Sequence, residues 1–183
     1  MTGLDSRDAI WVTSWASYND GTMHGGWIIL EEVVGLPPRE LEDVYEKLGL
    51  DPSGYDEELV IHDYDDYSGI GLYEMFGETH PEEVINFYAL LMDLDSSEIT
   101  IVKAIREAIG PEEAREAVEN GALGDYILLS EEDIRDDFYT RVEELDIPQD
   151  LKDAMDADKY IRDYSINYFK VTIDNTDYYL ANY

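Results

Sequence analysis

The sequence predicts an α+β fold in which three small domains follow one another along an elongated chain. Stretches rich in β-branched and aromatic residues occur near both ends, the middle has the apolar spacing of helices, and the connections between segments are short. We expect an N-terminal α+β domain over residues 1–67, a central helical domain over 68–123 and a C-terminal α+β domain over 124–183.

The N-terminal domain is predicted to combine a mainly antiparallel sheet with one helix. Three stretches have the composition of strands: residues 9–18, 26–32 and 57–64. The turn "NDGTMHGG" separates the first two, because Asn, Asp and Gly supply the dihedral angles that turns require. Residues 36–50 predict a helix, since Pro38 suits its first turn and Gly49 its end.

The central domain is predicted to contain three helices between residues 79 and 122. In the first, Thr79 is expected as the N-cap, Pro81 lies in the first turn, and acidic residues follow beside the helix N-terminus. The other two have helical spacing and end at glycines. Short connections between the three indicate a small helical unit.

The C-terminal domain is predicted to mix strands and helices. Residues 124–130 form a brief extended run, and residues 130–146 a helix with Ser130 or a neighbour as its cap. Residues 146–166 carry one or two short helices. Residues 167–183 predict two strands around an Asp-Asn turn.

The composition excludes several classes of function. The chain has no cysteine, so it offers no disulfide, iron–sulfur cluster or thiol nucleophile. No apolar run approaches the roughly 18 residues of a membrane span, and no signal peptide is visible, so we expect a cytoplasmic protein. P-loop, GxSxG and GxGxxG motifs are absent, and His24, His62 and His80 lack metal-ligand spacing. We therefore expect no enzyme, no cofactor and no metal.

One stretch, "VIHDYDDYSGIGLYE" at residues 60–74, has partial calcium-loop spacing. Counted from Asp63, the acids Asp65 and Glu74 fall at positions 3 and 12 of an EF-hand loop. Position 5 is Tyr67, however, and position 6 is Ser68 where the loop requires Gly. A strand, rather than a helix, is predicted to precede it. The stretch is better interpreted as the end of a strand that runs into an acidic turn.

The charge is the strongest signal in the sequence. The chain has 44 Asp and Glu against 12 Lys and Arg, a formal net charge of -32, and the acids are spread evenly along it. The acids repel one another, and this repulsion destabilises a compact state. Adaptation to high salt is one explanation, but the 16 Ile and 15 Tyr argue against it, since halophilic proteins tend to be poor in such residues. The other explanation is a partner that has evolved to bind a polyanion.

Duplex DNA offers a scale for this charge. It carries one negative charge per about 1.7 Å of axis, so a charge of -32 corresponds to about 54 Å, or about 16 base pairs. A chain that displays its carboxylates at such spacing could occupy a DNA-binding groove.

Five segments follow one another along the chain: "IWVTSWASYNDGTMHGGWI" (10–28), "ELVIHDYDDY" (58–67), "GIGLYEMFGETHPEEVINFYALLMDLD" (69–95), "YILLSEEDIRDDFYTRV" (126–142) and "YFKVTIDNTDYYLANY" (168–183). In this order, these segments together resemble the ArdA family of antirestriction proteins, which mimic DNA. The second is similar to the family's I-H-D-Y-E segment, and the fourth falls where the family has its antirestriction motif. The resemblance implies three small domains, a homodimer, and binding to type I restriction–modification enzymes in place of DNA, at the methyltransferase core with its specificity subunit. Direct nucleic-acid binding is not expected.

We expect the phosphate-mimicking surface to include thirteen acids: Asp63, Asp65, Asp66, Glu82, Glu83, Glu112, Glu113, Glu116, Glu131, Glu132, Asp133, Asp136 and Asp137. The antirestriction motif lies near the dimer interface in the family, and this implies five interface candidates: Ile127, Leu128, Ile134, Phe138 and Tyr139. The alternative is an acidic inhibitor of another nucleic-acid-binding enzyme, such as a CRISPR effector or a nucleoid protein.

Overall fold

The structure, a computed structural model, describes residues 3–22, 24–164 and 168–182. It contains two antiparallel three-stranded sheets, with the helices in separate stretches of the chain, so the α+β prediction is confirmed. Contacts group the residues into two compact units, 1–99 with 118–120 and 100–117 with 121–183. The division into three domains stays a prediction.

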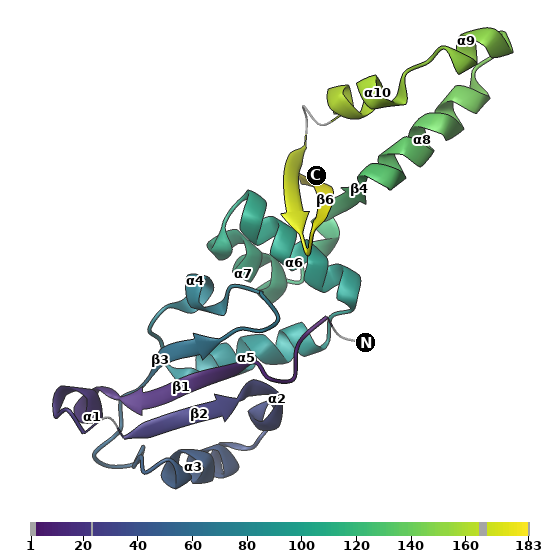
Figure 1. Cartoon of the computed structure of the whole chain (residues 1–183). Helices are drawn as coiled ribbons and strands as arrows, with labels where there is room; N and C mark the ends of the chain where they lie inside the picture. The colour runs from purple at the N-terminus through teal and green to yellow at the C-terminus, as the bar shows by residue number, and fades with distance from the viewer. Residues whose placement is uncertain (1–2, 23, 165–167, 183) are drawn as a thin grey trace. The chain divides into compact units, whose positions relative to one another are not determined.

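The first unit holds the N-terminal sheet and the helices around it (Figure 1). Its elements are β1 (Ala9–Ser14), α1 (Trp15–Asn19), β2 (Gly25–Ile29), α2 (Leu30–Val33), α3 (Pro38–Lys47), β3 (Leu59–Asp65), α4 (Leu72–Phe76) and α5 (Pro81–Met92). Two further helices contribute residues to both units, α6 (Ser96–Ala108) and α7 (Pro111–Glu119).

The strands of this first sheet lie in the order β2-β1-β3, with β1 at the centre. Trp11 of β1 lies opposite Trp27 of β2 and Asp63 of β3. The register shifts after Trp11, and the extra residue on β3 is His62. Such a β-bulge bends the strand locally.

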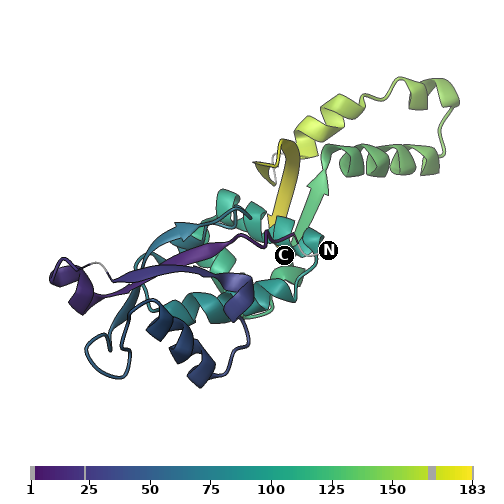
Figure 2. The same cartoon turned by 60° about the horizontal axis from the view of Figure 1, so that its bottom comes forward.

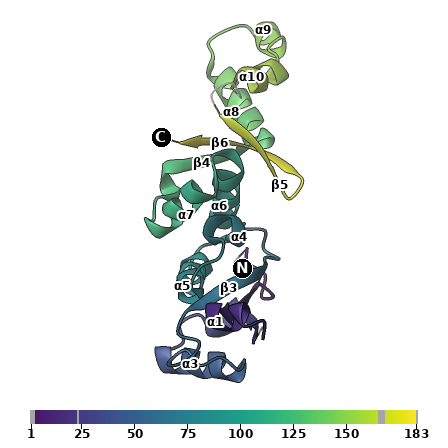
Figure 3. The ribbon, with the colours of Figure 1, turned by 90° about the vertical axis from the view of Figure 1, so that its left-hand side faces the viewer.

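One face of the sheet is buried against helices. Ile10 and Val12 of β1 are fully buried on that face, which α5 covers (Figures 1 and 3). The Leu48 side chain, after α3, occupies the space where a Cβ of Gly26 would lie, at 2.8 Å. A larger residue at position 26 would therefore push the end of α3 off the sheet. The opposite face carries Trp11 and Trp27.

Several predicted boundaries were wrong for local reasons. The strand predicted over 9–18 ends at Ser14, whose hydroxyl accepts a hydrogen bond from the Ser17 amide at 3.0 Å and caps α1. The strand predicted over 26–32 ends at Ile29, where α2 follows. The N-cap of α5 is His80 and not Thr79, and its Nδ1 accepts from the Glu82 amide at 3.3 Å. The short helix α4 was not predicted.

The second unit holds the C-terminal sheet and a pair of packed helices. Its elements, besides parts of α6 and α7, are the 3-10 helix η1 (Leu123–Asp125), β4 (Tyr126–Ser130), α8 (Glu131–Glu144), α9 (Gln149–Asp153), α10 (Ala157–Tyr164), β5 (Phe169–Ile173) and β6 (Thr176–Asn182). The predicted start of the last hairpin at residue 167, and its end at residue 183, lie outside the described residues.

The second sheet has the order β4-β6-β5 (Figure 3). Asp174 and Asn175 join β5 to β6 with φ angles of 48° and 65°, so the predicted Asp-Asn turn is confirmed. α8 and α10 lie side by side, with α9 in the connection between them (Figure 2). Ile134 of α8 packs against Ile161 of α10 and Tyr179 of β6, which joins the helices to the sheet.

Candidate functional site, an acidic surface

Acidic residues occupy the first turns of helices throughout the molecule. Glu82 and Glu83 begin α5, Glu112 and Glu113 begin α7, and the first turn of α8 is wholly acidic. The N-terminus of a helix carries a partial positive charge that favours a nearby carboxylate. This placement offsets part of the self-repulsion that a net charge of -32 creates.

Two of the predicted acids in the first unit lie on the sheet. Asp63 and Asp65 are both exposed on β3, two residues apart, and therefore share one face. Asp63 lies opposite Trp11 and Asp65 opposite Ala9, so both belong to the sheet face that carries Trp11 and Trp27. Carboxylates and indole rings thus lie together there.

Asp66 has a structural role that the sequence did not reveal. Its carboxylate accepts hydrogen bonds from the amides of Ile70, Gly71 and Leu72, at 3.1, 2.5 and 3.1 Å. These amides lie at the start of α4, where backbone donors otherwise lack partners. Asp66, in the stretch with calcium-loop spacing, therefore stabilises the local backbone.

Glu82 and Glu83 are exposed at consecutive positions of α5. Neither carboxylate makes a hydrogen bond or ion pair with another described residue, and both are available to a partner. Glu82 also borders a cavity, which is described below.

The acids of α7 divide between surface and contact roles. Glu112 and Glu116 are exposed. Glu113 is half-buried, and its carboxylate accepts a hydrogen bond from the Tyr126 hydroxyl at 2.5 Å. Burial, together with that bond, raises the pKa of Tyr126 to about 12. Glu113 therefore ties α7 to the start of β4.

Asp133, in the first turn of α8, forms a capping box with Ser130. The Asp133 carboxylate accepts from the Ser130 amide at 2.8 Å and its hydroxyl at 2.6 Å, while the Ser130 hydroxyl accepts from the Asp133 amide. The hydrogen bonds from Ser130 hold the pKa of Asp133 below its ordinary value. The expectation that Ser130 caps this helix is confirmed.

The remaining predicted acids of α8 differ in their contacts. Glu131 is paired with Arg135 at 3.1 Å, and Asp137 with Arg141 at 2.7 Å. Glu132 and Asp136 are exposed and make no such contact with another described residue. Among the predicted acids of α8, these two carry charge that no contact with another described residue offsets.

Most of the few cations are already paired within the chain. Ion pairs hold Arg7, Lys103, Arg106, Arg135, Arg141, Lys152 and Lys170. Because acids outnumber them so heavily, these pairs neutralise only a small part of the negative charge.

The five dimer candidates do not share one environment. Ile134 and Phe138 are 1% and 6% exposed and pack inside the unit, Phe138 against Val142 and Ala157. Ile127 and Tyr139 are 39% and 52% exposed. Leu128, beside Ile127 on β4, is half-buried.

One buried carboxylate in the first unit could not be predicted from the sequence. Asp8 is fully buried and accepts hydrogen bonds from the Ser68 amide at 2.9 Å and the Tyr88 hydroxyl at 3.0 Å. Burial, and to a smaller extent Asp8, raises the pKa of Tyr88. Asp8 joins β1, the loop after β3 and α5.

Exposed aromatic residues around the first sheet were also missed. The rings of Trp11 and Trp27 meet edge to face at 5.7 Å, and those of Trp15 and Tyr18 at 5.9 Å. Trp27 and Tyr18 are 42% and 41% exposed. The aromatic residues stand out in "IWVTSWASY", but their composition predicted a strand and not an exposed aromatic surface.

Neither metal-binding groups nor membrane-spanning helices occur in the part of the chain that the structure describes. No three His, Asp or Glu side chains there gather into a set that could hold a metal ion. None of the helices described is long and apolar enough to cross a bilayer.

The chain matches one protein family over most of its length. The model of the antirestriction protein family ArdA matches residues 10–178, which is nearly the whole sequence. The chain belongs to the ArdA family. No curated protein matches it significantly. Membership makes it an antirestriction protein, and the ArdA match includes all thirteen predicted acids and all five interface candidates.

Proposed function

We propose that this ArdA protein inhibits type I restriction–modification enzymes by occupying their DNA-binding groove. The observation that carries the proposal is the excess of exposed carboxylates on a folded chain of the antirestriction family. A groove that binds the phosphates of a duplex is lined by Lys and Arg side chains. A protein of net charge -32 competes with the duplex for those side chains and is drawn to the groove by the same long-range attraction. No chemical step is needed, so the protein acts as an inhibitor and not as an enzyme.

Seven of the predicted acids are the best candidates for direct contact. They are exposed, and their carboxylates make no hydrogen bond or ion pair with another described residue: Asp65, Glu82, Glu83, Glu112, Glu116, Glu132 and Asp136. The other six make hydrogen bonds or ion pairs within the chain, and two of them, Asp66 and Asp133, hold the backbone in place. The proposed surface therefore combines carboxylates that face the enzyme with carboxylates that shape the scaffold.

We propose that the target within the enzyme is the methyltransferase core, including the specificity subunit. Binding would take place in the cytoplasm, where incoming DNA is restricted. We further propose a homodimer. The support for it is β4, which pairs on one side with β6 and has no strand on its other side among the described residues. An unpaired strand edge can pair with another chain, and Ile127 and Leu128 lie on it.

A competition assay tests the function. A type I methyltransferase is bound to a labelled duplex that carries its recognition sequence, and the protein is added at several salt concentrations. We expect it to displace the duplex, and to do so less well as salt rises. Failure to displace the duplex at every salt concentration would remove this enzyme class as the target and favour another nucleic-acid-binding enzyme.

A further inference from the structure

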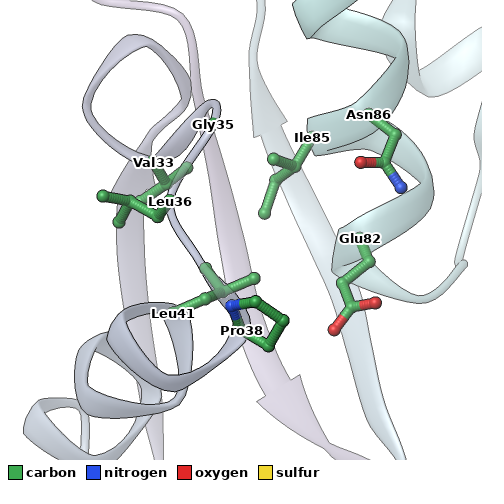
Figure 4. Close-up of a pocket in the computed structure, with 8 residues that line it drawn as sticks. All are labelled: Val33, Gly35, Leu36, Pro38, Leu41, Glu82, Ile85 and Asn86. Carbon is green, nitrogen blue, oxygen red and sulfur yellow. The ribbon is translucent and has the colours of Figure 1, made fainter.

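A small cavity lies beside α5 in the first unit (Figure 4). Its volume is about 160 Å³, and it lies between α5 and the segment that joins α2 to α3. Small-molecule sites usually measure about 300–1,000 Å³. The cavity is therefore of a size for one side chain and not for a nucleotide or a cofactor.

The walls of the cavity are apolar and its rim is polar. Val33 and Leu36 face Ile85 across the gap, with Leu41 below them (Figure 4). Val33, Leu41 and Ile85 are buried, whereas Glu82 is exposed at the rim. Glu82 and Asn86 lie one turn apart on α5 and bring a carboxylate and an amide to the same opening.

A buried hydroxyl lies one turn further along α3. Tyr45 is 2% exposed, and its hydroxyl has no hydrogen-bond partner among the described residues. Burial, and to a smaller extent the negative charge of Glu82, raises the pKa of Tyr45. The negative charge of Glu82 is therefore felt by the buried Tyr45 hydroxyl of α3, although the Glu82 side chain itself is exposed.

This combination suits a long basic side chain. Arginine and lysine bury an aliphatic stem along apolar surface and keep the charged head near water. A guanidinium offers several donors in a fixed plane, which suits a carboxylate and an amide oxygen side by side better than a single ammonium does. A partner that binds so acidic a surface is itself basic, so charge complementarity favours the same occupant.

We propose that this cavity takes an arginine side chain from the basic groove of the enzyme that the protein inhibits. The inference rests on the proposed function. The guanidinium lies at Glu82 and Asn86, and the aliphatic stem lies against Val33, Leu36 and Ile85. One acid then contributes through a shaped contact, whereas the other exposed acids contribute through the summed field.

Two neighbouring glutamates give a matched test. Glu82→Gln and Glu83→Gln each remove one charge from the same turn of α5, but Glu82 borders the cavity and Glu83 does not line it. In the competition assay we expect Glu82→Gln to raise the concentration needed for half-displacement about tenfold, and Glu83→Gln to raise it about twofold, since Glu83 contributes one charge to the summed field. Equal effects of the two substitutions would overturn the inference.

A second variant tests the cavity without a change of charge. Asn86→Phe places a ring at the rim, and we expect it to weaken displacement about fivefold or more. Thermal unfolding followed by circular dichroism should give midpoints close to that of the parent for all three variants, with the same small shift for the two glutamine variants, because the three positions are exposed and both glutamates lie in the first turn of α5. An Asn86→Phe protein that is folded and fully active would also overturn the inference.

The two proposals fail in different ways. If the parent protein displaces the duplex and the two glutamine variants are alike, the arginine contact is wrong and the inhibitory function stands. If the parent protein does not displace the duplex, the function is wrong and the arginine contact falls with it.

Discussion

The carboxylate of Asp66 lies 3.1 Å from the backbone nitrogen of Leu72 and closes the turn that leads into α4. It also accepts from the amides of Ile70 and Gly71. Three amides converge on one carboxylate, an arrangement in which a fixed negative charge satisfies several backbone donors. The stretch with calcium-like spacing thus uses this aspartate to organise its own backbone.

We expect Asp66→Ala to lower the free energy of unfolding by about 1–3 kcal/mol, because it leaves those amides without their acceptor. Asp65→Ala, one residue earlier, removes an exposed carboxylate that makes no hydrogen bond or ion pair with another described residue, and should change it by less than about 0.5 kcal/mol. Urea unfolding of both variants measures the difference. Equal stabilities would contradict the structural role of Asp66.

The capping box of α8 gives a pH-dependent prediction. Asp133→Asn should destabilise the protein by about 0.5–1 kcal/mol at neutral pH, since the charged cap is lost from the helix N-terminus. The folded-state pKa of Asp133 lies below its ordinary value, so its stabilisation is present above about pH 4 and is lost as the pH falls through the folded pKa. The gap between parent and variant should therefore shrink below pH 4.

Thermal unfolding of parent and Asp133→Asn proteins at several pH values between 2 and 7 measures this. Asp136→Asn is the control, because Asp136 is exposed on the same helix and has no part in the cap. A gap for Asp133→Asn that stays constant down to pH 2 would contradict the depressed pKa.

Much of the local structure was predictable because its causes are local. Pro38 and Gly49 lie beside the ends of α3, and Ser130 with Asp133 marks the start of α8 within four residues. The strand composition of β3 was visible in the sequence in the same way. Signals of this kind depend only on residues close together in the chain, so they can be recognised from the sequence alone.

The parts that could not be predicted depend on distant partners. β1 stops at Ser14, whose hydroxyl is also hydrogen-bonded to the Asp56 carboxylate, 42 residues away. Asp8 is one of 44 acids and is distinguished only by its contacts with Ser68 and Tyr88, 60 and 80 residues further on. A sequence this acidic hides its structural carboxylates among those that face solvent.

The distributed character of the inhibitory surface can be tested by grouped neutralisation. The substitutions Glu112→Gln, Glu116→Gln, Glu132→Gln and Asp136→Asn remove four exposed charges from the second unit. We expect the combined variant to displace duplex from a type I methyltransferase more weakly and with a shallower dependence on salt, because fewer charges contribute to the field.

Each of these four substitutions alone should have little effect, since many charges sum to the field that steers association. The same competition assay, run on the four single variants, provides the comparison. A single variant that abolishes inhibition while keeping its fold would show that one contact dominates in this unit.

The open edge of β4 gives a test of the proposed dimer. Ile127 is 39% exposed on that strand, and Ile127→Lys places a charge where a second chain would pair. Ile109→Lys is the control, because Ile109 is 42% exposed in the same unit but lies outside the strand. We expect sedimentation equilibrium to show weakened or lost association for Ile127→Lys, with a dimer dissociation constant raised about tenfold or more, a difference of about 1.4 kcal/mol. Ile109→Lys should associate as the parent does. A parent protein that stays monomeric would contradict the dimer itself, whereas a dimer unaffected by Ile127→Lys would place its interface away from β4.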